Sequence, residues 1–316
     1  MSLSKPAGPR SIALIGPYSS GKTTLLEAIL NICGETDRKG SITNGTTVGD
    51  SSKEARDRQM SVEVNSAHFS FLGDDFAILD CPGSVEFLQE SENALIGVDA
   101  AVLVCEPVDD RSVTLLPLFK FLEERNIPTF MFVNKIDKAQ GTIHDLFRAL
   151  EGASNRDLVL RQVPIVADDI ITGYVDLASE RAYVYKEGKA SKIIDMPPEM
   201  AEQEGTSRFT MLETLADFDD HLMEELLEDI EPEKEEIYKL LSHDLQQGFV
   251  VPVFLGSAEN DFGVRRLLKA LRHEVPSAEM TAERLGISAD ASTQVAQVLK
   301  TYMSAQGGKL SLVRIW

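Results

Sequence analysis

The chain has 316 residues, a mass of 34.8 kDa and a formal net charge of −20, which is enough length for one large domain or two ordinary ones. Its hydrophobic content of 43% is normal for a globular protein with a sizeable core, and its longest apolar runs are too short to span a bilayer. A chain this acidic repels phosphates, so we expect no binding of free nucleic acid. From the short apolar runs we expect no membrane partner.

The first half of the chain alternates short buried runs with helical patterns, which indicates an α/β fold with a mainly parallel sheet and helices on both faces. The expected hairpin pairs Ser66–Phe71 with Phe76–Leu79 across the turn Gly73-Asp74-Asp75. The other expected elements of this fold are the strands Ile12–Ile15, Ala100–Cys105, Thr129–Val133 and Val250–Leu255, and the helices Lys22–Ile32, Leu115–Glu124 and Val264–His273.

Between Asn155 and Gln247 the pattern changes to that of an inserted α+β subdomain. We expect an antiparallel meander followed by two acidic amphipathic helices, the first broken near Gly205. The expected elements are the strands Leu158–Val166, Ile170–Leu177 and Arg181–Tyr185, and the helices Pro198–Glu228 and Pro232–Gln247. After Pro276 we expect a looser segment and then two further strands, Gln294–Tyr302 and Lys309–Trp316, the second ending without a partner, as in a piece of a longer protein.

The segment Gly16-Pro17-Tyr18-Ser19-Ser20-Gly21-Lys22-Thr23 follows an expected strand and opens an expected helix, which is the context of a phosphate-binding loop. Its backbone N–H groups would surround phosphate oxygens at a helix N-terminus. Lys22 would reach the β- and γ-phosphates, and the Thr23 hydroxyl would bind Mg²⁺. A simple glycine turn that caps a helix is the alternative, which spacing and context disfavour. The candidate phosphate-binding residues are Ser19, Ser20, Gly21, Lys22, Thr23 and Thr24.

Two further segments point to the metal and the terminal phosphate. Asp80-Cys81-Pro82-Gly83 ends a strand, where Asp80 would hold Mg²⁺ through water and the Gly83 N–H would sense the γ-phosphate. Arg56–Ser61 lies in a polar stretch after the first helix, where the Ser61 hydroxyl would bind Mg²⁺ when GTP is present. On spacing alone, a solvated loop is nearly as good an interpretation of Arg56–Ser61.

We expect two segments to recognise the base. Asn134-Lys135-Ile136-Asp137 directly follows the expected strand Thr129–Val133, and Ser257-Ala258 begins one residue beyond the expected strand Val250–Leu255. Asp137 can accept hydrogen bonds from N1 and N2 of guanine, which adenine cannot supply, and a site built for such a polar edge rejects a base that lacks it. The Lys135 stem would lie over the base, Asn134 would tie the segment to the phosphate loop, and the Ala258 N–H would meet guanine O6. The nucleotide is therefore predicted to be GTP or GDP.

These motifs, in this order, resemble those of the translational GTPases, and the flanking residues narrow the similarity to the elongation factor G family. The similarity runs from Ser11 to Ala278 and includes Val163-Pro164-Ile165, Asp217–Glu224 and Val251–Ala258. It implies a GTP-binding domain at 11–154 and 248–278, an inserted subdomain at 155–247, and a linker with the start of a truncated β-barrel at 279–316. Residues 1–10 would be a flexible N-terminus.

The chain departs from that family at several motif positions, as a divergent paralogue would. Ser19 replaces an aspartate of the phosphate loop, Ser61 replaces a threonine, and Cys81 replaces another threonine. Ser84 stands where the family has the histidine that positions the attacking water. The candidate catalytic residues are Lys22, Gly83 and Ser84.

By this resemblance the chain would hydrolyse GTP on the ribosome, in translocation, recycling or ribosome protection. Ser84 keeps open an alternative, a nucleotide-gated ribosome-binding module with little GTPase activity. The three cysteines have no disulfide or metal-ligand spacing, and from the residues at the start of the sequence we expect no export. We therefore expect a cytoplasmic monomer with reduced thiols, in which the five scattered histidines have no ligand partners nearby in sequence.

Overall fold

A seven-stranded sheet forms the centre of the computed structural model, which describes residues 8–50, 52–107, 113–139, 143–167, 170–287, 294–304 and 308–316. Its strand order is β2-β3-β1-β4-β5-β11-β6, and every neighbouring pair is parallel except β2 with β3. The strands are β1 (Arg10–Ile15), β2 (Asn65–Phe71), β3 (Asp74–Asp80), β4 (Ala100–Cys105), β5 (Thr129–Val133), β6 (Asp157–Leu160) and β11 (Val250–Leu255). The expected α/β fold class is confirmed.

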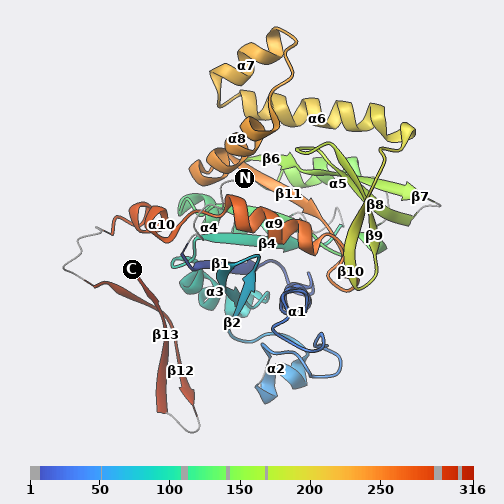
Figure 1. Cartoon of the computed structure of the whole chain (residues 1–316). Coiled ribbons are helices and arrows are strands. Elements are labelled where there is room, and N and C mark those ends of the chain that lie inside the picture. Colours follow the sequence, from blue (N-terminus) through green and yellow to red (C-terminus); the bar gives the residue numbers. More distant parts are fainter. Residues whose placement is uncertain are drawn as a thin grey trace.

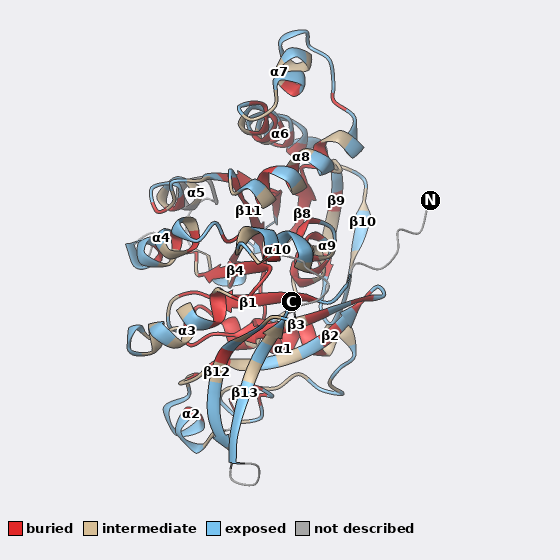
Figure 2. Ribbon diagram, turned by 90° about the vertical axis from the view of Figure 1, so that its left-hand side faces the viewer, coloured by how far each residue is buried: buried red, intermediate tan, exposed pale blue. Residues whose placement is uncertain are grey.

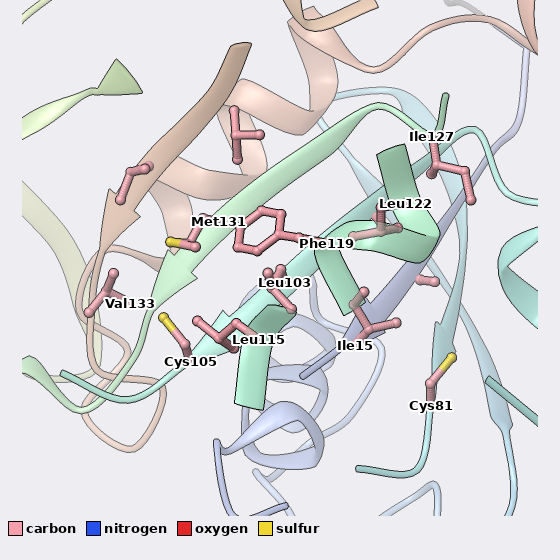
Figure 3. Packing of buried hydrophobic residues seen from close by; sticks show 14 of the residues in the cluster. Ile15, Cys81, Leu103, Cys105, Leu115, Phe119, Leu122, Ile127, Met131 and Val133 are labelled. Atoms are coloured by element: carbon pink, nitrogen blue, oxygen red, sulfur yellow. The ribbon is translucent and has the colours of Figure 1, made fainter. Parts of the chain in front are cut away.

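Helices cover both faces of this sheet (Figure 1). Helices α1 (Lys22–Cys33) and α9 (Val264–Glu274) pack their leucines on one face. On the other face lie α3 (Leu88–Leu95), α4 (Leu116–Glu124) and α5 (Ile143–Glu151). There Phe119 of α4 points at the strands beside Leu103 and Met131 (Figure 3). The central strands are buried on both faces, as expected for a parallel sheet (Figure 2).

A second, antiparallel sheet of order β10-β9-β8-β7 packs with helices beside the first. Its strands are β7 (Gln162–Ala167), β8 (Ile170–Asp176), β9 (Arg181–Lys186) and β10 (Lys189–Ile194). Its helices are α6 (Ala201–Ala216), α7 (Asp220–Leu227) and α8 (Lys234–Gln247). Val175, Leu215 and Ile237 lie in the core that these elements share.

The expected strand Leu158–Val166 is in fact two strands that belong to different sheets. β6 pairs with β11 in the large sheet, and β7 pairs with β8 in the small one. Arg161 lies between them and is fully buried, and its Nη1 donates to both Glu274 oxygens, at 3.1 and 2.9 Å. A buried guanidinium requires such a partner, so this ion pair fixes the position where the chain passes between the sheets.

Three other expectations were wrong in detail. The first acidic helix breaks at Asp217–Asp219 and not near Gly205, because the Asp219 side chain accepts a hydrogen bond from the Leu222 N–H and starts α7. The segment after Pro276 contains a helix, α10 (Ala278–Arg284), capped by Ser277. The β2–β3 turn is Leu72-Gly73, both with positive φ, because Asp74 already belongs to β3 and pairs with Arg10 at 2.8 Å.

The remaining elements are short or peripheral. α2 (Lys53–Arg58) forms where we expected a loop, and its N-cap Ser52 accepts from the Ala55 N–H. β12 (Ala296–Ser304) and β13 (Gly308–Ile315) form a separate antiparallel pair. Arg10 begins β1 and is buried, whereas residues 1–7 of the expected flexible N-terminus lie outside the described residues.

All three cysteines are free thiols. None of the helices within the described ranges is both long and apolar enough to cross a bilayer.

Candidate nucleotide-binding site

Four of the predicted motifs meet at one edge of the large sheet. β1, β3, β5 and β11 run parallel, so the residues that follow them lie at the same end. These residues are Gly16–Thr23 after β1, Cys81–Ser84 after β3, Asn134–Asp137 after β5 and Ser257–Ala258 close after β11. The sheet topology thus assembles segments that are far apart in sequence.

The phosphate loop needs glycine at two positions. Gly16 has φ 145°, and a Cβ there would lie 2.0 Å from the Val104 carbonyl oxygen. Gly21 has φ 91°, and a Cβ there would lie 2.3 Å from Nδ2 of Asn134. Both the backbone angle and the close packing exclude larger residues. Ser19 also has a positive φ of 68° and is exposed, Ser20 is buried and Thr24 is half-buried.

Lys22 lies inside the loop that precedes it. Its ammonium donates to the carbonyl oxygens of Gly16 at 3.0 Å and Pro17 at 2.9 Å, and only 6% of the residue is exposed. Burial lowers the pKa of Lys22, and the nearby Asp80 opposes that shift. A Cβ on Gly83 would lie 2.3 Å from the Lys22 ammonium nitrogen. The absence of a side chain at Gly83 therefore brings its backbone against the lysine charge.

Thr23, Ser61 and Asp80 form a buried cluster of oxygen atoms. The Thr23 hydroxyl donates to Oδ2 of Asp80 at 2.6 Å and lies 3.1 Å from the Ser61 hydroxyl. Oδ1 of Asp80 is buried and has no hydrogen-bond partner in the described part of the chain. Burial raises the pKa of Asp80 to about 7, against the effects of the Thr23 hydrogen bond and of Lys22. Hard oxygen donors with one unsatisfied carboxylate oxygen fit Mg²⁺.

Asp80→Asn should stabilise the metal-free chain at high pH. The pKa of Asp80 is raised from an ordinary 3.8 to about 7, so the native state holds the proton more tightly than the unfolded state. This contribution to stability is complete below about pH 4 and is lost as the pH rises through about 7. Asparagine has no charge to bury and should not show the loss.

Urea unfolding in EDTA measures this effect. The midpoint of the variant should exceed that of the original chain at pH 8, and the gap should narrow at pH 5. The same variant should lose the strengthening of nucleotide binding by Mg²⁺. A gap of equal size at both pH values would contradict the assignment of the buried charge to Asp80.

The Asn134 side chain joins three of the motifs. Its Nδ2 donates to the Ser20 carbonyl oxygen at 2.8 Å, and its Oδ1 accepts from the Ala258 N–H at 2.8 Å. The expected tie to the phosphate loop is therefore present in the structure. The expected contact of the Ala258 N–H with guanine O6 is not available in this arrangement, because Asn134 already occupies that donor.

Lys135 and Asp137 belong to the same motif as Asn134, and they differ in whether their side chains already have hydrogen-bond partners. Lys135 has a positive φ of 62°, and its ammonium donates to the Ser19 carbonyl oxygen at 2.7 Å and to the Glu106 carboxylate. Asp137 is exposed in a short 3-10 helix, Ile136–Lys138, and within the described chain it makes no hydrogen bond. Its carboxylate is thus free to accept from a ligand, whereas the Lys135 stem lies along the phosphate loop.

Ser257 and Ser84 have different surroundings. Ser257 is fully buried, its backbone bridges to Phe262, and its hydroxyl accepts from Asn260 at 3.0 Å. It shapes the loop that presents Ala258. Ser84 is half-buried before the 3-10 helix Val85–Phe87, and its hydroxyl makes no capping hydrogen bond. No side chain therefore fixes the orientation of the Ser84 hydroxyl within the described residues.

Comparison with known proteins decides the family. The model of the elongation factor Tu GTP binding domain matches residues 8–277. The chain belongs to this family. It is 49% identical over 308 residues to an elongation factor G-like protein of Synechocystis, covering 97% of this chain and 46% of that protein. It is 32% identical over 274 residues to elongation factor G 1 of Borreliella burgdorferi, covering 85% of this chain and 39% of that protein.

A solved structure agrees with these relatives. A crystal structure from Thermus thermophilus superimposes with a TM-score of 0.86 at 29% identity, over 97% of this chain and 45% of that one. The resemblance to the elongation factor G family is therefore confirmed. The chain spans about half the length of the curated relatives that it matches.

Two contacts that hold the loop around Gly40 were not found from the sequence. Glu27 of α1 is fully buried, and its carboxylate accepts from the N–H groups of Gly40 at 3.0 Å and Val48 at 2.6 Å. Lys39 donates to the Glu259 carbonyl oxygen at 2.8 Å and to the Asp261 carboxylate at 2.6 Å. A glutamate among the apolar positions of α1 was a usable signal for the first contact, whereas Lys39 gave none.

One expectation about histidine was wrong. His221 of α7 lies 3.8 Å from the carboxylate of Glu225, one turn later, and 3.6 Å from that of Glu236 on α8. The three side chains could hold a metal ion by their mutual distances. His221 is 68% exposed, and an exposed cluster of this kind is commonly an ordinary surface ion pair.

Proposed function

We propose that the chain binds GTP and GDP with Mg²⁺ and hydrolyses GTP to GDP and phosphate, coupled to a step of translation on the ribosome. The observation that carries this proposal is the bridging of Ser20 and Ala258 by Asn134. That bridge holds the phosphate loop and the two base-recognition segments as one site. Family membership supports the nucleotide, and the relatives named elongation factor G support the link to translation.

Each segment of the site has its own part in this function. Backbone N–H groups of Ser19–Thr24 would surround the phosphates, and the Lys22 ammonium would exchange its two loop carbonyls for phosphate oxygens. Asp137 would accept from the guanine edge, and Lys135 would cover the base. Ser257 would support the loop that carries Ala258. Guanine O6 would then require a donor other than the Ala258 N–H, or a shift of Asn134.

The oxygen cluster would hold the metal ion through Thr23, Ser61 and Asp80. When bound, Mg²⁺ would neutralise charge that develops on the phosphates during transfer. The Thr23 hydroxyl would have to release Asp80 for this, and Asp80 would have to be ionised. Through the contact of Ser61 with the metal ion, the loop that contains Ser61 would become ordered when GTP is bound and would relax after hydrolysis.

Hydrolysis would also need an oriented water molecule beside Gly83 and Ser84. The Gly83 backbone lies against the Lys22 ammonium and would sense the terminal phosphate. The Ser84 hydroxyl is a short and unfixed group, so turnover would be slow. The second candidate function, a nucleotide-gated ribosome-binding module with little hydrolysis, is favoured by this residue alone. We place both functions in the cytoplasm, in a monomer.

We also propose the division of the chain that follows from these roles. The GTP-binding domain would comprise 11–161 and 248–278, because β6 pairs with β11 and Arg161 pairs with Glu274. The inserted subdomain would then begin at Gln162. The segment 279–316 would be a linker and the start of a β-barrel.

Phosphate release tests the function directly. GTP and ATP should be supplied to the 316-residue chain, and to any longer protein that contains it, with and without ribosomes and Mg²⁺. We expect Mg²⁺-dependent release from GTP and not from ATP, increased by ribosomes. GTP binding without release under any condition would favour the binding-module alternative, and no preference for guanine nucleotides would refute both candidates.

A further inference from the structure

A groove of about 920 Å³ lies between α8, α9 and the strands β8 to β10. Figure 2 shows these elements next to one another, and Phe71 and Leu72 at the β2–β3 turn form another part of the wall. None of the residues assigned above to the nucleotide lines this groove. Its volume is typical of a site for a small molecule.

The groove gathers cationic side chains in a chain with a net charge of −20. Six lysines and arginines line it, and one of them, Arg266, pairs with Asp176. The other five are Arg181 of β9, Lys189 of β10, Lys239 of α8, and Arg265 and Lys269 of α9. Within the described residues none of these five has an ion-pair partner, although the chain has 51 acidic residues against 31 basic ones. Five unpaired like charges around one groove repel one another, and an anion bound there would offset that repulsion.

The acidic residues of the groove do not supply that anion, because most are already paired. Asp176 pairs with Arg266, Glu274 with the buried Arg161, and Asp261 with Lys39. Asp176 and Glu274 are each only 2% exposed. Glu235 is the one lining carboxylate without an ion pair among the described residues. The open part of the groove is therefore strongly positive.

Aromatic side chains provide an apolar surface in the same groove. The rings of Tyr174 and Tyr183 stack with centroids 5.0 Å apart, and Tyr238 of α8 lines the same groove. Tyr174 is buried, whereas Tyr183 is half-buried and Tyr238 is 38% exposed. Tyr183 and Tyr238 therefore offer ring surface for a planar group and hydroxyls for hydrogen bonds. A ligand that fits this groove would carry phosphate groups next to the cations and a planar ring system next to the tyrosines.

We propose that this groove is a second ligand site that binds a phosphorylated aromatic small molecule of the nucleotide class. Arg181, Lys189, Lys239, Arg265 and Lys269 hold its phosphates, and Tyr183 and Tyr238 contact its ring system. A di- or triphosphate concentrates several negative charges in one ligand, which suits a groove lined by several cations. An acidic peptide presents carboxylates on one face of a strand only every ~7 Å, which matches a groove of this size less well.

Calorimetry with ADP tests the site, using the 316-residue chain loaded beforehand with one equivalent of GDP and with Mg²⁺, so that the phosphate loop is filled and no excess GDP competes for the groove. We expect ADP to bind, more weakly at higher salt, and inorganic tripolyphosphate to compete with it. Arg265→Ala combined with Lys269→Ala should weaken ADP binding by about tenfold or more, since a hydrogen bond to a charged group contributes roughly 1.5–3 kcal/mol.

The matched control is Lys186→Ala with Lys192→Ala. These two lysines lie on β9 and β10, are exposed and do not line the groove. This control should change ADP affinity less than about twofold, and GDP affinity should be the same in all variants, which shows that they fold. Absence of ADP binding, or an equal loss in both double variants, would overturn the proposal. So would groove-dependent binding of a polyglutamate peptide without binding of ADP or tripolyphosphate.

Discussion

Asp137→Asn should weaken the binding of GTP and GDP by about 30-fold to 150-fold. The change replaces an acceptor by a donor in front of the N–H groups of guanine, and a lost hydrogen bond to a charged group costs roughly 2–3 kcal/mol. Asp137 makes no other hydrogen bond within the described residues, so the fold should not change. Calorimetric titration with GDP measures the loss.

A base with the reversed pattern provides the control for this prediction. Xanthine has a carbonyl where guanine has its 2-amino group, so the amide of the variant can donate to it. Xanthosine diphosphate should therefore bind the variant better than it binds the original chain. Unchanged GDP affinity, or a loss that xanthosine diphosphate does not recover, would show that Asp137 does not face the base.

Ser84→His should increase GTP turnover on ribosomes by about a hundredfold or more. An imidazole can both donate to and accept from a water molecule, and proton transfer by a placed side chain contributes typically about 10²- to 10⁴-fold. The serine hydroxyl is shorter and has no partner that fixes it in the described chain. Single-turnover hydrolysis, with GDP affinity as a check on the fold, measures the change.

Ser84→Ala is the matched variant for that experiment. If the hydroxyl takes no part in orienting water, its removal should leave turnover within about twofold of the original chain. A large loss on Ser84→Ala would show that the serine itself is catalytic. No gain on Ser84→His would show that some other feature limits the reaction.

The sequence predicted the elements and motifs whose causes are local. Gly16–Thr23 was identified because positive backbone angles and a following helix require that pattern, and Ile12–Ile15 because β1 is buried on every residue. The register of the parallel strands then placed the motifs together. The oxygen cluster of Thr23, Ser61 and Asp80 was expected as a metal site, and the structure brings these three side chains within hydrogen-bonding distance.

The features that sequence analysis missed depend on distant partners. The chain crosses from the large sheet to the small sheet at Arg161, and the buried charge of Arg161 pairs with Glu274, more than a hundred residues later. No local sequence pattern indicates this crossing. The occupied N–H of Ala258 depends on Asn134. The cationic groove draws on two strands and two helices, so it becomes visible only after the chain has folded.

Lys39 couples the loop that follows α1 to the loop that follows Ser257-Ala258. Its ammonium ties the loop around Gly40 to the carbonyl oxygen of Glu259 and the carboxylate of Asp261, directly after the residue pair Ser257-Ala258. Glu27 holds the same loop to the helix that begins at the phosphates. Because energetic coupling between two sites is reciprocal, a base that orders the loop around Glu259 also favours the ordered form of the loop around Gly40. Ordering of the loop around Gly40 would in turn strengthen the binding of the base by the same factor.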